Sequence, residues 1–530
     1  MRLPHTVPTE AFEAFRCSEE TMQLPGELDR TLRAEDDKWD TVGIPEDLKI
    51  QALRVIAANW CKNPILDELP TGVDRDYLIE ILPLDIDFKF VFRKIKYEHY
   101  WQRAAEARWK VNDPMDHGDS WRRLYCERHL WEYLENLDPT YFDLLREECE
   151  ELLELVHEHV HVLKLRQLQP VKSLVIKHIN DDHKNPSPIY LNEEFHHIPM
   201  DLILQKLPNL QEIYINIGVI HLKDNFDLKD FEFSIDDSLK IGQGVKELNN
   251  LIKFSLTRSN LTRPRVGAIL RGLIVNNTDD SLWLNIILSF IQIREIDFSH
   301  CKLENQGALA VSAFLIQRNT NSELMSLSLS NNKIGSEGLA GIVHGLILSD
   351  TNFMGIRRLD LKFNPIGDEG ADHLAALLLR YAKLEYLNIS CCGIGSDGGM
   401  KMAEVLASGH TQFTNLQFDC TNNEFGTIVG EAFVAAVKSC TAITEIDLRI
   451  CGFSNESQNS IIQSVNRNRA KFKREQRRRQ TSVRKDKKRI LSLLVPSEFA
   501  TFQTPFSAPI KGYEIKDKSS SCHDNEEEIM

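Results

Sequence analysis

The sequence predicts an α/β solenoid in which repeated strand–turn–helix units follow a helical N-terminal region. A leucine-rich phrase recurs at nearly equal spacing through the C-terminal half of the chain. The region before residue 155 lacks this phrase and instead shows apolar residues at helical spacing between prolines. At 530 residues the chain also exceeds what one compact core usually supports, which favours a stacked architecture.

The repeated phrase has the form L-x-x-L-x-L-x-x-[N/C]-x-[I/L]. It starts at Ile293, Leu324, Ile356, Leu384, Phe413 and Ile443, so the intervals are 31, 32, 28, 29 and 30 residues. Repeats of this length have room for a full helix after each strand. The pattern therefore predicts a leucine-rich-repeat horseshoe of the ribonuclease-inhibitor type. Fainter copies predict earlier strands that begin near Val160, Val171, Pro208 and Leu251.

Each position of the phrase has a physical role. The alternating apolar residues place one face of a strand in the core. Where the chain leaves the strand, a short polar or thiol side chain can satisfy backbone groups inside the solenoid. The residues at this place are Asn332, Asn364, Cys301, Cys392 and Cys451. In the repeat that starts at Phe413, the turn-filling Phe425 arrives about two residues late. We therefore expect a bulged turn at Thr421–Glu424.

The chain divides into four parts on these patterns. We expect a flexible N-terminus over 1–40, a helical domain over 41–155, the repeat solenoid over 156–466, and a basic segment with a flexible, acidic-ended tail over 467–530. The helical domain caps the first repeats, because a solenoid needs its terminal repeats covered. Its helices are expected over Glu46–Cys61, Asp74–Leu82, Phe88–Trp109, Trp121–Leu137 and Tyr141–His157. A last helix is expected over Asn455–Asn468.

Charge and composition restrict the class of protein. The net charge is -15, yet Arg467–Arg489 holds 13 Lys/Arg against two acids, so the remainder carries about -26 by subtraction. An acidic body without a broad basic face does not indicate a general nucleic-acid binder. We recognise neither a secretory signal nor a membrane-spanning run. Eleven cysteines without an export signal suggest a reducing compartment. The composition favours a soluble, cytosolic protein.

The basic run Arg467–Arg489 has three interpretations. It can be a solvated linker, either disordered or continuing the last helix. It can dock onto an acidic polymer or protein surface, for instance tubulin. It can also serve nuclear targeting or nucleic-acid binding.

One short motif matches a metal-site signature. His157–His161 reads H-E-H-V-H, which fits the H-E-x-x-H pattern of zinc proteases. The pattern falls at the junction between the last predicted N-terminal helix and the first strand, where no long helix holds the two outer histidines on one face. We recognise no phosphate-binding glycine loop and no nucleophile elbow. We therefore expect a non-enzymatic protein without a metal or cofactor site.

The better candidate site is the concave face of the solenoid, where the polar residues between core positions point. Mixed charges with an aromatic residue suit a protein partner. Because a long concave surface is the usual binding site of this fold, we predict protein binding there. The alternative is that these positions are polar only because they face water. The predicted contact residues are Arg294, Asp297, Arg358, Asp360, Lys362, Tyr386, Glu445, Asp447 and Arg449.

Several phrases resemble one family, the leucine-rich-repeat subunit of the nexin–dynein regulatory complex (subunit 5, also called T-complex-associated testis-expressed protein). The phrases are CKNPIL from Cys61, YWQRAAEARW from Tyr100, HGDSWRRLYCERHL from His117, FSLTRSNL from Phe254 and EIDLRICGFSNES from Glu445. The resemblance covers about residues 50 to 470. The N-terminal positions that match are Trp101, Arg103, Trp109, His117, Gly118, Trp121, Arg122, Glu127, Arg128 and His129.

The resemblance implies a structural subunit of motile cilia and flagella, which links outer doublet microtubules and helps regulate dynein. The implied location is the cytoplasm, cytoskeleton and axoneme, and the implied partners are other subunits of the complex. Tubulin or dynein arms are candidate partners of the basic segment; neither a membrane nor nucleic acid is expected. The matching N-terminal residues form either a packed cap or a docking surface. The extension beyond residue 470 departs from the family pattern.

Two other functions use the same repeats. IPEDLKIQALRVI from Ile44 faintly resembles the start of an F-box, which would suit the substrate receptor of a ubiquitin ligase. The third hypothesis is a GTPase-activating protein, although an acidic segment would then be expected directly after the repeats.

Overall fold

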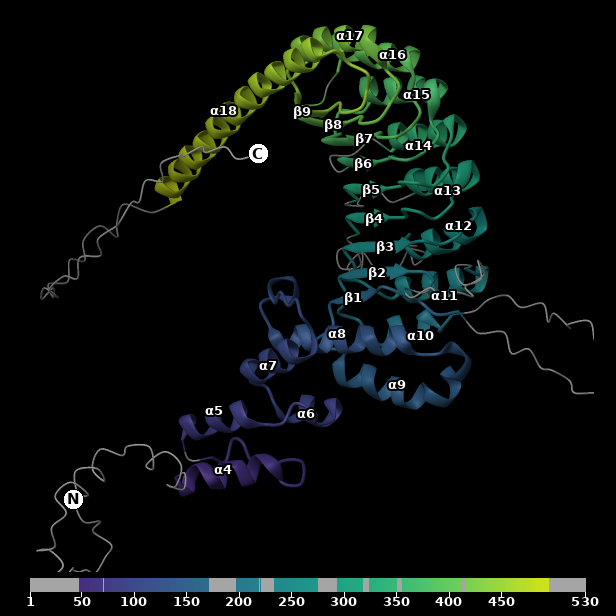
Figure 1. The fold of residues 1–530 in the computed structure, drawn as a ribbon. Coiled ribbons are helices and arrows are strands. Elements are labelled where there is room, and N and C mark those ends of the chain that lie inside the picture. The colour runs from purple at the N-terminus through teal and green to yellow at the C-terminus, as the bar shows by residue number, and fades with distance from the viewer. Residues whose placement is uncertain are drawn as a thin grey trace, which may run out of the picture.

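The protein is a curved solenoid with one long parallel sheet along its inner side and helices along its outer side (Figure 1). The computed structural model describes residues 47–69, 71–170, 197–218, 220, 233–274, 293–317, 324–349, 355–411, 413 and 415–494. The expected flexible N-terminus, the strand expected near Val171 and the acidic-ended tail beyond residue 494 lie outside the described residues. The α/β leucine-rich-repeat fold expected from the sequence is confirmed.

The sheet has nine strands in strict sequence order, each paired in parallel with the next. They are β1 (Val162–Leu165), β2 (Glu212–Asn216), β3 (Lys253–Thr257), β4 (Glu295–Asp297), β5 (Ser326–Ser328), β6 (Arg358–Asp360), β7 (Tyr386–Asn388), β8 (Leu416–Asp419) and β9 (Ile443–Asp447). The outer helices are α10 (Met200–Gln205), α11 (Ile235–Lys246), α12 (Arg263–Gly272), α13 (Glu304–Gln317), α14 (Ser336–Leu348), α15 (Gly367–Arg380), α16 (Ser396–Ala407) and α17 (Gly426–Ser439). The strands expected near Val160, Pro208 and Leu251 are thus present as β1, β2 and β3.

A ladder of buried Asn and Cys side chains joins neighbouring repeats at the end of each strand. The Asn364 amide donates to Leu329 O at 2.9 Å and to Leu361 O at 2.7 Å, while its Oδ1 accepts from the backbone N–H groups of Asn332 and Ile334. Each such side chain therefore replaces hydrogen bonds that the tight turn leaves unmade. The role predicted for these Asn residues is confirmed.

Cysteine serves as the donor at the same place. The Cys301 thiol donates to Leu256 O at 3.1 Å, and Cys392 and Cys451 donate to Leu361 O and Cys420 O. All three cysteines are buried. A thiol offers a weak donor and little acceptance, so it supplies only part of the asparagine contacts.

The bulged turn expected at Thr421–Glu424 is wrong. Asn423 takes the asparagine place with the same bonds, accepting from Cys392 N and Ile394 N and donating to Ile389 O. The next apolar residue, Phe425, follows it at the usual distance and is buried. The extra residues lie before the strand instead, because Phe418 pairs with Leu387 and the Cys420 side chain fills the next core position.

The N-terminal region contains α4 (Leu48–Ala58), α5 (Gly72–Ile81), α6 (Phe88–Lys94), α7 (Glu98–Arg108), α8 (Trp121–Asn136) and α9 (Phe142–Val156), with short 3-10 turns at Met115–His117 and Pro139–Tyr141. The single helix expected over Phe88–Trp109 is wrong, since it breaks at Ile95–Tyr97. Side chains bind the backbone where it breaks: the Trp101 indole donates to Ile95 O at 3.0 Å, and the Arg122 guanidinium donates to Phe92 O at 2.9 Å. These tertiary bonds replace the helical ones.

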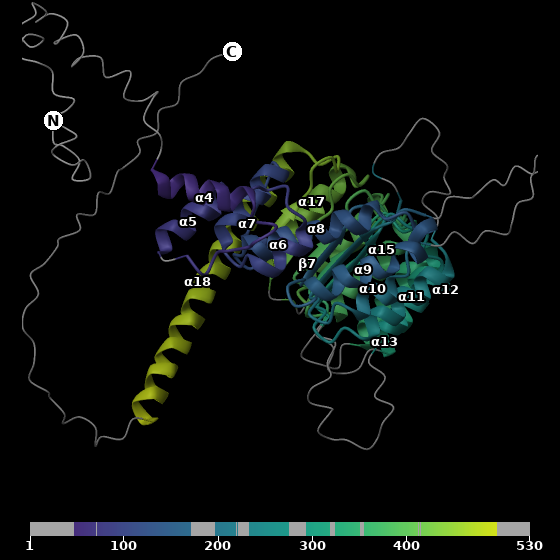
Figure 2. The same cartoon turned by 90° about the horizontal axis from the view of Figure 1, so that it is seen from below.

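The helix expected over Asn455–Asn468 continues through the basic run as α18 (Asn455–Leu494), 40 residues long. Its first half covers the last repeat, where the buried Asn468 amide donates to Val437 O, Cys440 O and Ile443 O. Its second half projects away from the solenoid (Figures 1 and 2). The basic run is therefore helical, continuing the last helix, over the residues that the structure describes.

We expect Asn364→Ala to destabilise the protein by about 3 kcal/mol, because four buried backbone groups lose a partner. Asn364→Cys should cost less, since a thiol can still donate to Leu329 O as the cysteines of other repeats do to theirs. Urea unfolding followed by circular dichroism measures both. Equal losses for the two variants would contradict the proposed role of the thiol as donor.

Candidate interaction surfaces

Helix α8 binds the free edge of the sheet with side chains. Glu127 is fully buried, and its Oε1 accepts from His161 N at 2.8 Å and Val162 N at 3.0 Å. The same carboxylate accepts from the Arg123 guanidinium at 2.9 Å and forms a short hydrogen bond with the His117 ring. A buried carboxylate is stable only when it is bonded in this way. Glu127 therefore ties α8 to the start of β1.

Two further residues on the same face of α8 continue this contact. Trp131, one turn after Glu127, donates its indole N–H to Val162 O at 2.9 Å. Glu135, one turn further, is buried and accepts from Arg166 N at 2.7 Å and from the Arg166 guanidinium. His161 O already accepts from β2, so the backbone groups of Val162 face away from the sheet, toward α8. Glu127, Trp131 and Glu135, each four residues from the next, thus provide the hydrogen bonds that a further strand would otherwise make with β1.

Most residues of the N-terminal motif belong to this cap. The Arg103 guanidinium donates to the carbonyl groups of Ile79 and Leu82. Trp101 is buried, and the Arg122 guanidinium lies 4.3 Å from the Phe92 ring centroid. Gly118 has φ +68, a left-handed conformation that ends the 3-10 turn before α8. The half-buried Trp121 begins α8.

His129 is half-buried on the other side of α8. Its ring centroid lies 4.0 Å from that of Phe88, and the Arg108 guanidinium lies 2.9 Å from its Nδ1. Burial, with the Arg108 charge added, lowers the pKa of His129 to about 4. The ring is therefore neutral at neutral pH and accepts from Arg108.

Two motif residues face outward instead. The Trp109 indole donates to Glu132, and its ring lies 5.1 Å from the Arg108 guanidinium and 5.4 Å from that of Arg128. Arg128 donates to Val111 O and to the Asn112 side chain. Trp109 and Arg128 line a pocket of about 310 Å³ beside β1, together with Lys164 and Arg166. The motif thus forms a cap and also one open surface.

The H-E-H-V-H sequence lies between α9 and β1, outside regular structure. The His157 ring bonds to Glu154 O, and the His161 ring to His159 O. The His159 ring packs edge-on against Phe92. Among the described residues, no group of three His, Cys, Asp or Glu is placed to hold a metal ion. Likewise, no helix in the described part of the chain is long and apolar enough to cross a membrane.

The concave face carries polar residues in register across all nine strands. One row runs through Lys164, Tyr214, Ser255, Asp297, Ser328, Asp360, Asn388, Asp419 and Asp447. A neighbouring row runs through Glu212, Lys253, Glu295, Ser326, Arg358, Tyr386, Gln417 and Glu445. The strands thus place Asp297, Asp360 and Asp447 in one row, on β4, β6 and β9, and Arg358, Tyr386 and Glu445 in the neighbouring row.

Many of these side chains are held by their neighbours. The Arg358 guanidinium lies 4.5 Å from the Tyr386 ring centroid, and Arg449 makes a two-pronged contact with Asp447, 2.7 Å at its shortest. Burial raises the pKa of Asp360, Lys362 opposes the rise, and the Asp297 and Asp419 charges add to it. Asp297, Asp360 and Lys362 line a shallow hollow of about 620 Å³. Arg294 lies just before β4, where its backbone N–H donates to Ile252 O and its carbonyl oxygen accepts from Met325 N and Ser326 N.

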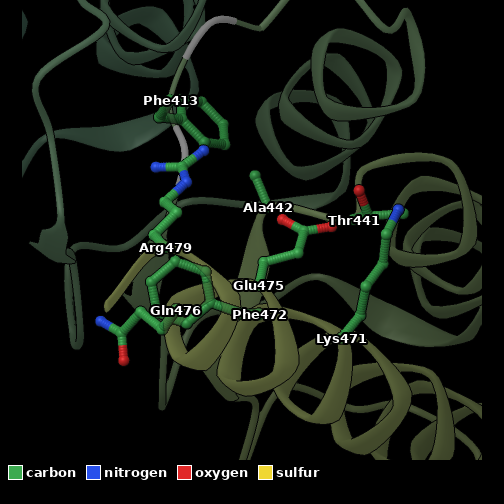
Figure 3. A pocket seen from close by; sticks show the side chains of 8 residues that line it. All are labelled: Phe413, Thr441, Ala442, Lys471, Phe472, Glu475, Gln476 and Arg479. Atoms are coloured by element: carbon green, nitrogen blue, oxygen red, sulfur yellow. The ribbon is translucent and has the colours of Figure 1, made fainter. Parts of the chain in front are cut away.

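At the other end of the solenoid, a small pocket of about 210 Å³ lies between the residues that precede β8 and β9 and the middle of α18 (Figure 3). Phe413, Ala442 and Phe472 provide its apolar walls. The side chains of Lys471, Glu475 and Arg479 surround it. Beyond Phe472, every helix side chain that the structure describes is exposed as far as Arg484.

Sequence reasoning missed Trp131, Glu135, Lys164 and Arg166. A signal existed for the first two: a carboxylate, an indole and a carboxylate at i, i+4 and i+8 share one helix face. The burial of Glu135 against β1 could not be anticipated, because charged residues are seldom fully buried without a partner. Lys164 in β1 and Arg166 just after it alternate with core leucines, so their outward direction was readable but their proximity to Arg128 was not.

The fold and the repeats identify the chain as a leucine-rich-repeat protein, and a family profile described as Leucine Rich repeat matches residues 320–343, 356–375 and 382–403. The chain is also a relative of proteins named dynein regulatory complex subunit 5, which confirms the resemblance seen in the sequence. The mouse protein is 26% identical over 288 residues, covering 53% of this chain and 54% of its own length. The Chlamydomonas reinhardtii protein is 38% identical over 116 residues, covering 22% of this chain and 29% of its own length.

The chain spans about half the length of the mouse relative that it matches. Among solved structures, the tropomodulin C-terminal domain of Caenorhabditis elegans is similar at 16% identity, covering 33% of this chain and 98% of that chain with a TM-score of 0.27. So low a TM-score supports no argument about function.

We expect Glu127→Ala to destabilise the protein by about 3–5 kcal/mol, because it leaves His117, Arg123 and two N–H groups of the sheet edge without their shared acceptor. Glu127→Gln, which keeps one oxygen, should cost less. The measurement is urea unfolding of the whole chain. Glu106→Ala on the exposed face of α7 is the control, with an expected effect within about 0.5 kcal/mol. A Glu127→Ala protein as stable as this control would contradict the role given to α8.

Proposed function

We propose that this protein is a non-catalytic structural subunit of the dynein regulatory complex in the ciliary or flagellar axoneme. The observation that carries the proposal is its relation to proteins named dynein regulatory complex subunit 5, from mouse to a green alga. In this role it is a scaffold of the cytoskeleton that binds other subunits and helps regulate dynein-driven motility. The fold supports such a role, because a solenoid offers an extended surface for protein partners.

The state of the concave side chains supports a protein-binding surface. Arg358 stacks on Tyr386, Arg449 is bonded to Asp447, and Arg357 pairs with Glu385 at 2.8 Å. Side chains already held in place lose less conformational freedom on binding. We therefore propose the concave residues named from the sequence as partner contacts, with Arg358 and Tyr386 at the centre because Arg and Tyr dominate binding energy at interfaces.

The buried ionisable pairs support a structural role. His117 and Glu127 fasten α8 to the sheet edge. His197 and Asp237 join the start of one described segment to the first turn of α11, with a ring-to-carboxylate distance of 3.0 Å and a second bond from the His197 N–H. The carboxylates of Glu127 and Asp237 each also accept hydrogen bonds from backbone N–H groups. Neither alternative function, the ubiquitin-ligase receptor or the GTPase-activating protein, is favoured by a specific observation.

We further propose that the projecting half of α18 binds an acidic surface such as that of tubulin or a dynein arm. At 1.5 Å per residue the whole helix is about 60 Å long. Its exposed part from Lys473 to Arg484 carries six described cations and one carboxylate, Glu475. Because the rest of the chain is acidic, the cationic half of α18 is the part of the protein that would attract an acidic polymer.

The proposed location is tested with a tagged chain expressed in ciliated cells. We expect it to decorate motile cilia along their length and to remain with the axoneme after detergent extraction, together with other subunits of the complex. A tagged protein that stays in the cell body, or that washes out with detergent, would contradict the proposal.

The α18 proposal is tested by co-sedimentation with microtubules at low and physiological salt. Arg477→Glu/Arg478→Glu should weaken binding at least about tenfold at low salt, because charge reversal turns attraction into repulsion. The control Lys246→Glu/Lys438→Glu makes the same change of charge on exposed positions of α11 and α17. Equal binding by the two double variants would exclude α18 as the microtubule contact.

A further inference from the structure

The pocket beside β1 stands at the N-terminal rim of the concave sheet. It has a volume of about 310 Å³ and is lined by the α7–α8 connection, by α8 and by β1. Figure 1 shows α8 directly adjoining β1 and the α7–α8 connection standing beside the strand ends. The Lys164 position continues into the concave row through its register partner Tyr214. A ligand in the pocket therefore borders the concave face.

Positive charge gathers at this pocket. Arg128, Lys164 and Arg166 line it, against the single carboxylate of Glu132. Both oxygens of Glu132 are already used, one by the Trp109 indole and the other by Arg108 at 2.6 Å. Burial lowers the pKa of Arg128, and the Glu132 charge opposes this. The Arg166 charge adds to the lowering, which indicates that the two guanidinium groups repel each other.

Lys164 is the most available of the three cations. Its side chain is exposed, and among the described residues it forms no ion pair. Its ammonium lies 5.7 Å from the Tyr214 ring centroid, and the Lys253 ammonium lies 5.2 Å from the same centroid. Arg166, by contrast, is occupied by Glu135, although its side chain is 60% exposed. A bound anion would relieve the repulsion among these groups.

The pocket also has a firm apolar wall. Trp109 is fixed by its bond to Glu132 and by the guanidinium groups of Arg108 and Arg128. Beside it, Val111 is 78% exposed, although Arg128 holds its carbonyl oxygen. An exposed aliphatic side chain on a backbone that is itself held in place suits a contact with a partner.

We propose that this pocket binds an acidic segment of another protein subunit, with one apolar side chain against Trp109 and Val111 and one or more carboxylates at Lys164 and Arg166. The inference rests on the proposed membership in a multi-subunit complex. It answers the question of whether the N-terminal motif is a cap or a docking site: Glu127, Trp101 and Arg122 form the cap, and Trp109 and Arg128 form the docking site on top of it.

Charge complementarity and position select this occupant. Three cations around a volume of a few side chains suit carboxylates, and the apolar wall adds a demand that a free inorganic anion does not meet. The pocket is continuous with the row of concave side chains, along which an extended segment can run. A segment leaving the pocket next meets Tyr214, whose hydroxyl donates to Glu212, and Lys253, which pairs with Glu295 at 2.9 Å.

The test is photo-crosslinking in the assembled axoneme. A benzophenone amino acid replaces Val111 in the tagged full-length chain; Ile428 on α17, 72% exposed, receives the same replacement as the matched control. We expect the Val111 position to crosslink to one other subunit, at a peptide that contains acidic residues and that the control position does not label. Adding Lys164→Glu should lower the yield about fivefold, since it reverses the charge that faces the segment, while Lys164→Arg should preserve it.

The outcomes separate this inference from the proposed function. If the tagged chain never reaches the axoneme, the proposed function fails. If it is incorporated but Val111 gives no crosslink, or gives one to a peptide without acidic residues, the function stands and the docking site is wrong. A yield unchanged by Lys164→Glu would likewise overturn the assignment of carboxylates to this pocket.

Discussion

The structure depends on how the free edge of the first strand, β1, is hydrogen-bonded. A strand at the edge of a sheet presents unpaired N–H and C=O groups that invite pairing with another chain. Helix α8 bonds the groups of His161, Val162 and Arg166 with Glu127, Trp131 and Glu135. Because these side chains come from the helical region, that region and the solenoid are bonded together at the edge of the sheet. The division of the chain into a helical domain and a solenoid at residue 155 stays a prediction.

The opposite end of the sheet is closed by the same principle with different residues. The Asn468 amide on α18 binds three carbonyl groups of the last repeat, and the Arg469 guanidinium donates to Thr444 O at 3.1 Å. Both ends are therefore bonded to helices through side chains. Between them, the Asn and Cys ladder holds the described repeats from β4 onward in fixed register. A surface held this rigidly loses less conformational freedom when a partner binds.

The sequence predicted the parts of the fold that repeat. Six nearly equally spaced phrases predicted the solenoid, and the role expected of Asn332, Asn364 and the cysteines was correct because backbone groups in every such turn need a partner. The irregular parts were less readable. The helix over Phe88–Trp109 looked continuous because helical spacing does not reveal that Trp101 and Arg122 bind the backbone at its middle. The late Phe425 was assigned to a bulged turn, whereas the turn is regular and the extra residues precede the strand.

The candidate surfaces were predicted unevenly for a related reason. Alternation along a strand is enough to tell that Asp297, Arg358 and Tyr386 share the concave face. It does not tell which of them bind one another, and it gives no sign that Arg128 on a helix and Arg166 after a strand meet at one pocket. Such long-range meetings depend on the angle between α8 and β1, which the buried bonds of Glu127 and Glu135 set.

Amide hydrogen exchange at the edge of the sheet tests the central claim most directly. If α8 stands in for a strand, the N–H groups of Val162 and Arg166 exchange as slowly as those of the inner strands, and replacing Glu127 with alanine releases Val162 while the N–H of Leu329, deep in the solenoid, stays protected. Rapid exchange of Val162 and Arg166 in the unaltered protein would show that the sheet edge is open and would contradict the account.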